Sequence, residues 1–148
     1  MAELKDMEEL ASLRLGLEKL ESKVLKPELT DLNHIPLLFE WYKEVAEEIK
    51  DFPKQTETEY KQRFMYCILM LYSPRFFAGQ TIERGVRDEL AKLFKLSAVH
   101  VSNLCRDIAF FYRMYFTFQR DSDIVLGKIS ERIEQQTIQL IQRGMSEI

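Results

Sequence analysis

The stretch ELAKLFKLSAVHVSNLCR, residues 89–106, holds two helical patterns separated by a short turn. Apolar residues recur at three- and four-residue spacing on both sides of Lys95, as they do on the buried face of a helix. Ser97 follows shortly after, and serine often caps the N-terminus of a helix. We therefore predict one helix over residues 85–95 and a second, long helix over residues 97–115. The inward-facing residues predicted for this second helix are Val101, Leu104, Ile108, Phe111, Tyr112 and Tyr115.

The same stretch resembles the helix-turn-helix motif of bacterial and phage DNA-binding proteins. The positions that carry the resemblance are Leu90, Ala91, Ser97, Val101, Ser102 and Leu104. Ala91 is small where the two helices of the motif cross closely. Val101 and Leu104 would pin the second helix to the core, which implies that its other face is free to enter a major groove. Lys95 occupies the turn position that most family members fill with glycine, and a positive φ there would cost about 1 kcal/mol.

The resemblance implies two sets of DNA-contacting residues. The base-reading candidates are Ser97, Ala98, Val99, Ser102, Asn103 and Arg106. The phosphate-contact candidates are Arg84, Arg87, Lys92, Lys95, His100 and Arg113. Asparagine can pair with adenine and arginine with guanine, whereas phosphate contacts position the protein without reading sequence. The alternative is a solvated polar face whose side chains pair along the helix.

A wider resemblance covers residues 72–126. The stretches YSPRFFAG, GVRDELA and FFYRMYFTFQRDSDI resemble uncharacterised helix-turn-helix-like proteins from phages and mobile elements of Bacteroidetes. This implies an origin and no activity. Within the first stretch, Ser73, Pro74 and Gly79 predict a single helical turn with a cap, a first-turn proline and a stop.

Charge is unevenly distributed along the chain. The total is −3, so the molecule does not bind nucleic acid through bulk positive charge. Nine basic and four acidic residues lie in the segment 61–113, which gives that segment +5 and leaves −8 for the remainder. Because phosphate contacts supply most non-specific affinity, a basic segment that contains the motif favours DNA as a partner.

The N-terminal segment, residues 1–26, carries a heptad-like seam. Its apolar residues are spaced three, four, three and four apart, and they are Leu10, Leu13, Leu17, Leu20 and Val24. One interpretation is a coiled-coil arm that joins two subunits. The other is a helix packed on its own domain. Pro27 ends this helix, because proline lacks the donor that a helix interior requires.

The remaining segments are also helical in pattern. Residues 27–57 hold a connector and a helix over 37–50, whose inward face is formed by Leu38, Trp41, Val45, Ala46 and Ile49. The core segment, residues 58–120, begins with a helix to about Tyr72. The triplet Asp121-Ser122-Asp123 would cap a last helix in residues 121–148. We therefore expect an all-α protein with a trihelical helix-turn-helix-like core and long terminal helical arms.

Composition and residue types argue against several classes of protein. Gly 5 and Pro 4 are few for a strand-rich fold. Cys67 and Cys105 lie in apolar stretches, which favours buried reduced thiols over a disulfide or redox pair. No catalytic constellation, metal-ligand spacing or cofactor motif is present, so we expect no enzyme activity, no metal and no cofactor. The charged N-terminus and the short apolar runs indicate a cytoplasmic protein without a membrane segment.

These patterns lead to two functional expectations. The first is a homodimeric regulator of a phage or mobile element that binds double-stranded DNA. The second is a non-enzymatic structural or interaction component, such as a phage particle protein, an adaptor or an inhibitor of a host protein. Its interface would use the dense aromatic segment, whose members also suit a core or stacking on unpaired bases: Phe110, Phe111, Tyr112, Tyr115, Phe116 and Phe118.

Overall fold

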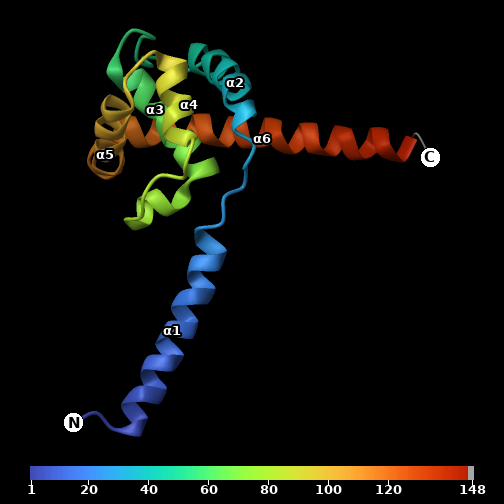
Figure 1. Cartoon of the computed structure of the whole chain (residues 1–148). Coiled ribbons are helices and arrows are strands. Elements are labelled where there is room, and N and C mark those ends of the chain that lie inside the picture. The colour runs from blue at the N-terminus through green and yellow to red at the C-terminus, as the bar shows by residue number, and fades with distance from the viewer. Residues whose placement is uncertain (147–148) are drawn as a thin grey trace.

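Helices form the framework of the chain over residues 1–146, the part that the structure, a computed structural model, describes. The all-α prediction is confirmed, and no strand occurs in that part. Two short 3-10 turns, η1 and η2, join the longer helices (Figure 1). In chain order the elements are α1 (Leu4–Val24), η1 (Leu32–His34), α2 (Ile35–Glu47), α3 (Thr58–Tyr72), η2 (Pro74–Ala78), α4 (Val86–Phe94), α5 (Ala98–Met114) and α6 (Phe116–Ser146).

α3 is the centre of the bundle, because eleven of its fifteen residues are buried. α2, α4, α5 and α6 all pack against it (Figure 1). Phe64, Met65 and Ile68 are fully enclosed, and rings from α2 and α4 meet the Phe64 ring. A helix that is apolar on nearly every side is stable only when other helices surround it. The apolar run of α3 therefore dictates its central position.

α2 follows the predicted pattern in part: it ends at Glu47 instead of residue 50, and Trp41 and Ile49 are only half-buried. Leu38, Val45 and Ala46 are buried as expected. The most enclosed residue of α2 is Tyr42, which the apolar pattern did not single out. Its hydroxyl donates a hydrogen bond to the backbone carbonyl of Tyr60, so its polar atom is satisfied inside the core. α2 thus belongs to the same core as α3.

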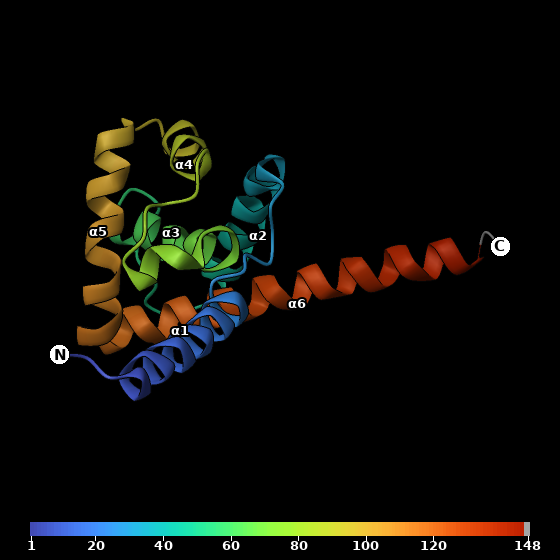
Figure 2. The same cartoon turned by 60° about the horizontal axis from the view of Figure 1, so that its bottom comes forward.

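The aromatic segment divides at Tyr115, where the backbone is extended at φ −118° and ψ 111°. α5 ends just before this residue and α6 begins just after it, and the two helices run in sharply different directions (Figure 2). The predicted start of the last helix at Asp121 is therefore wrong. Tyr115 itself is exposed, contrary to its predicted inward position. Residues 147–148 of the predicted last segment lie outside the described residues.

Asp121 has a different role, because it forms a buried ion pair with Arg63. Its Oδ2 lies 3.1 Å from Nε of Arg63 on α3, and both side chains are almost completely enclosed. Arg63 also donates to the backbone carbonyl of Glu59 at 3.1 Å, and its guanidinium lies 4.9 Å from the centre of the Phe118 ring. Asp121 also pairs with a second arginine, because its Oδ1 accepts a hydrogen bond from Nη2 of Arg120 at 3.0 Å. These contacts supply the partners that two buried charges require.

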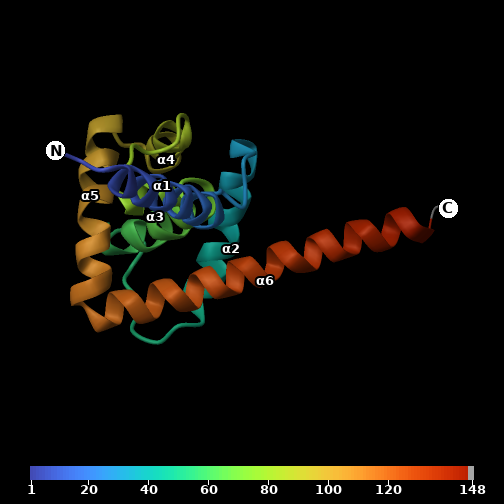
Figure 3. The same ribbon diagram turned by 90° about the horizontal axis from the view of Figure 1, so that it is seen from below.

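Two helical arms extend from the bundle. No residue of α1 is buried, and α1 projects away from the other helices (Figure 1). Of the two interpretations of this helix, packing on its own domain is therefore wrong. α6 is buried against the bundle in its first half, whereas residues 134–144 are all exposed and extend beyond it (Figure 3).

The buried ion pair yields a stability prediction. Asp121→Ala leaves Arg63 charged and unpaired in the core, so we expect the free energy of unfolding to fall by about 3–5 kcal/mol. Urea unfolding measures this change. The control is Glu44→Ala, which removes the surface pair between Glu44 and Arg132 and should cost less than about 1 kcal/mol. Equal losses for the two variants would contradict the prediction.

Candidate nucleic-acid interface

The turn between α4 and α5 has the geometry that the sequence indicated. α4 ends at Phe94, and Lys95 adopts a left-handed conformation with φ 56° and ψ 46°. The N–H of Leu96 donates to the carbonyl of Ala91 at 2.9 Å, which closes the turn. Ser97 is the N-cap of α5, and its Oγ accepts the N–H of His100 at 3.1 Å. The predicted cap at Ser97 is confirmed, and Lys95 has the positive φ that glycine adopts more easily at this position.

One face of α5 is fixed against the bundle. Val101, Cys105 and Ile108 are fully buried on it. Leu104 is half-buried, and its carbonyl accepts a hydrogen bond from the Gln62 side chain at 3.1 Å. Because one face is anchored in this way, the opposite face of α5 is held outward.

The base-reading candidates lie on or beside this outward face. Val99 is 70% exposed, although it is apolar, and Ser97, Asn103 and Arg106 are exposed as well. Ala98 and Ser102 are half-buried toward the sides of the helix. Arg106 donates through Nη2 to Oδ1 of Asn103 at 3.2 Å, so these two side chains are already oriented together.

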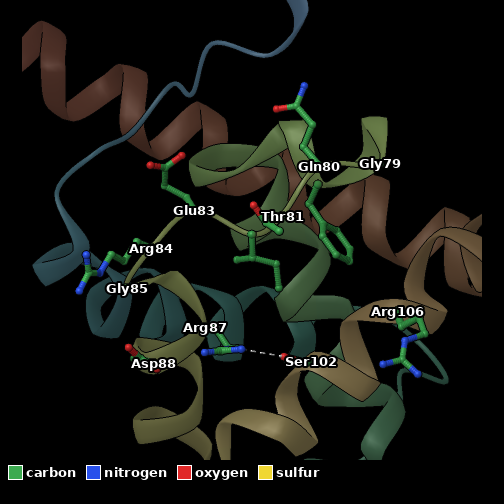
Figure 4. A pocket seen from close by; sticks show the side chains of 12 residues that line it. Gly79, Gln80, Thr81, Glu83, Arg84, Gly85, Arg87, Asp88, Ser102 and Arg106 are labelled. Atoms are coloured by element: carbon green, nitrogen blue, oxygen red, sulfur yellow. Dashed lines mark hydrogen bonds between the residues drawn. The ribbon is translucent and has the colours of Figure 1, made fainter.

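A groove of about 740 Å³ lies between the loop at 79–85, the first turn of α4 and one side of α5. We call it the arginine groove, because Arg84, Arg87 and Arg106 line it. Figure 4 shows Arg87 pointing across the groove toward Ser102, and its Nη1 lies 3.5 Å from the serine Oγ. The groove is thus lined by two phosphate-contact candidates, Arg84 and Arg87, and by two base-reading candidates, Ser102 and Arg106.

The other phosphate-contact candidates are not part of this groove. Lys92, Lys95, His100 and Arg113 are all exposed, but none of them lines it. Arg113 lies two helical turns beyond Arg106 and donates to the carbonyl of Ala109 at 3.3 Å. The six candidates therefore divide into one pair that lines the groove, Arg84 and Arg87, and four separate surface positions.

The structure also corrects the charge count of the basic segment. Arg63 is buried in its ion pair and cannot contribute to a basic surface. Arg75 pairs with Glu83 at 3.0 Å. Sequence reasoning singled out neither pairing, because the partners are set by tertiary contacts. The loop residues Gln80 and Thr81, which also line the arginine groove, carried no recognisable motif.

The aromatic residues fall into two groups. Phe118 is buried, and Tyr112 stacks on Tyr66 with ring centres 5.0 Å apart. In contrast, Phe116 is 74% exposed, and Phe110 and Tyr115 are each about half exposed at the corner between α5 and α6. These rings therefore do not all belong to one core.

The two cysteines are unpaired and buried, as expected. Burial raises the pKa of the Cys105 thiol to about 12, and it raises the pKa of Cys67 as well. Thiols held neutral in this way are poor nucleophiles. Over the described residues, no group of three or more His, Cys, Asp or Glu side chains is arranged to hold a metal ion.

Comparisons of the chain with protein-family models, curated proteins and solved structures gave no match. A bilayer-spanning helix would need a longer apolar run than any that the helices of residues 1–146 contain.

The strained turn yields a second prediction. Lys95→Gly relieves the left-handed strain, so we expect the free energy of unfolding to rise by up to about 1 kcal/mol. Lys92→Gly is the matched control, since it places glycine within α4 and should cost about 1 kcal/mol. Thermal and urea unfolding of both variants measure the difference. If Lys95→Gly destabilises as much as Lys92→Gly, the turn is not strained.

Proposed function

We propose that the chain is a DNA-binding regulator that acts in the cytoplasm and inserts α5 into the major groove of duplex DNA. The observation that carries this proposal is the unit formed by α4, the tight turn at Lys95 and α5. Its second helix is anchored on one side and presents exposed polar and basic residues on the other. The origin in a phage or mobile element rests on the sequence resemblance alone.

In this proposal the outward face of α5 contacts base edges. Asn103 is suited to adenine and Arg106 to guanine, and exposed Val99 offers an apolar contact for a thymine methyl. Arg84, Arg87, Lys92 and Lys95 surround this face from the α4 side, where the phosphate backbone would run. Such contacts fix the position of the protein on the duplex.

We also propose that two copies associate through α1. The apolar seam of α1 is at least half exposed along its whole length, and its residues are Leu10, Leu13, Leu17, Leu20 and Val24. A parallel pairing with Leu10 at position a places Glu9 of one helix beside Arg14 of the other, which are oppositely charged. The exposed distal half of α6 offers further apolar area, including Ile138 and Ile141. A two-fold dimer would require two DNA half-sites at helical-turn spacing.

The DNA-binding proposal is tested by fluorescence anisotropy with duplex DNA at two salt concentrations. If four phosphates are contacted, raising salt from about 50 to about 200 mM should weaken binding about a hundredfold. On a selected sequence, Asn103→Ala should lose about 1–3 kcal/mol of discrimination between adenine and other bases. Lys92→Ala should weaken all sequences equally. Binding that stays undetectable at low salt would overturn the proposal.

The dimer proposal is tested by analytical ultracentrifugation. Leu17→Asp places a charge in the seam and should shift the protein from dimer to monomer, because a buried unpaired carboxylate is strongly disfavoured. Leu15→Asp is the matched control, since Leu15 is equally exposed but lies outside the seam. Neither residue contacts the core, so both variants should fold. A monomeric wild-type protein, or equal effects of both variants, would contradict an α1 dimer.

A structural or interaction component is the second candidate function. The exposed aromatic corner at Phe110, Tyr115 and Phe116 favours it, because large apolar patches on a surface commonly mark contact sites. In that case Phe116→Ser would disrupt assembly, whereas changes at Asn103 and Lys92 would have no effect.

A further inference from the structure

The loop that forms one wall of the arginine groove is fixed by contacts with η2. Ser73 is buried, and its Oγ accepts the backbone N–H of Glu83 at 2.7 Å. The Glu83 carboxylate pairs with Arg75 at 3.0 Å. Both contacts hold Glu83, which immediately precedes Arg84. The position of this arginine is therefore set by the fold.

Two glycines fix the ends of the same loop. Gly79 has φ 87° and Gly85 has φ 92°, a conformation that other residues adopt only with strain. A Cβ on Gly85 would also lie 2.6 Å from Cδ1 of Leu32, so a larger residue would have to displace the Leu32 side chain. Arg84 and Arg87 flank this glycine. The groove is consequently formed before any ligand binds.

The charges that line the groove are not balanced within the protein. Three arginines and two acidic residues line it, and Arg84 lies at its outer edge and points outward (Figure 4). One of the acids, Glu83, is already paired with Arg75. Asp88 is the remaining acid, so the lining keeps an excess of two positive charges. Over residues 1–146, Arg84 has neither a hydrogen-bond nor an ion-pair partner. Among the same described residues, the only hydrogen bond or ion pair of the Arg87 guanidinium is the long one to Ser102.

We infer that the arginine groove is a binding site for phosphate esters. Guanidinium groups bind phosphate oxygens through paired hydrogen bonds, and the hydroxyls of Thr81 and Ser102 are further donors in the groove. Phe76 and Ile82 add apolar lining on which a sugar or base can rest. The volume of about 740 Å³ is that of a site for a small ligand rather than for a single ion.

Phosphate esters of this kind have two sources. One is the backbone of duplex DNA, in which case the inference deepens the proposed function and rests on it. The other is a free nucleotide, which would bind beside the outward face of α5 without any DNA. The two sources share the same chemistry at Arg84 and Arg87 but differ in the experiment that detects them.

The first arm of the test uses isothermal titration of the full chain with adenosine 5′-monophosphate and with inorganic phosphate, without DNA. If the free nucleotide is the ligand, Arg87→Gln should weaken its binding at least about tenfold, since charged hydrogen bonds are lost. Lys128→Gln is the control, because it removes one exposed positive charge from α6, outside the groove. It should bind the nucleotide like the wild type.

The second arm uses the salt dependence of duplex binding. If the backbone is the ligand, Arg84→Gln and Arg87→Gln should each lower the slope of log K against log salt by about 1. Lys128→Gln should leave the slope unchanged. Both arginines are exposed, so the folded state of the variants can be verified by circular dichroism.

The outcomes separate this inference from the proposed function. Nucleotide binding that depends on Arg87, without any duplex binding, supports the groove and overturns the DNA proposal. Duplex binding with unchanged slopes in both arginine variants, together with no nucleotide binding, overturns the groove and leaves the DNA proposal intact. If neither ligand binds, both are wrong.

Discussion

The buried ion pair between Arg63 and Asp121 is the contact on which the arrangement of the bundle depends. Removing two charges from water costs several kcal/mol for each ion, and this cost is offset only while the partners stay in register. A shift of α6 along α3 would separate the charges and also remove the Phe118 ring from the guanidinium. Because α5 passes into α6 through the single extended residue Tyr115, the same pair determines where α5 lies relative to α3 and α4.

Much of the fold follows from local signals, and the exceptions have physical reasons. The turn around Lys95 and the cap at Ser97 depend on adjacent residues, so the sequence predicts where they lie. The break at Tyr115 carries neither glycine nor proline, and cap-type residues at Asp121 mark a false start instead. Asp121 is tolerated inside α6 because Arg63 lies against it, 58 positions away in the sequence. No local pattern contains that information.

In the candidate interface, too, some features follow from the local sequence and others depend on tertiary contacts. Helical periodicity predicts that Asn103 points away from Val101. In agreement, Asn103 is exposed and Val101 is buried. The presence of Arg84 and Arg106 on opposite sides of one groove depends instead on the path of the loop at 79–85 (Figure 4). That path is set by the hydroxyl of Ser73, which directly precedes η2, and by the absence of a side chain at Gly85. The sequence therefore predicts which face of α5 is exposed, but it does not predict the groove beside that face.

The exposed arms bear on whether one copy would suffice for DNA binding. A single recognition helix with its flanking arginines offers a small contact area, and single modules of this size bury only about 600–1,000 Å² on DNA. Linking two copies makes the second contact intramolecular and raises the affinity without any new residue at the interface. An apolar seam that is exposed along all of α1 is costly in water unless another helix covers it. The need for a second copy at the DNA and the need for a partner at α1 would be met by the same dimer.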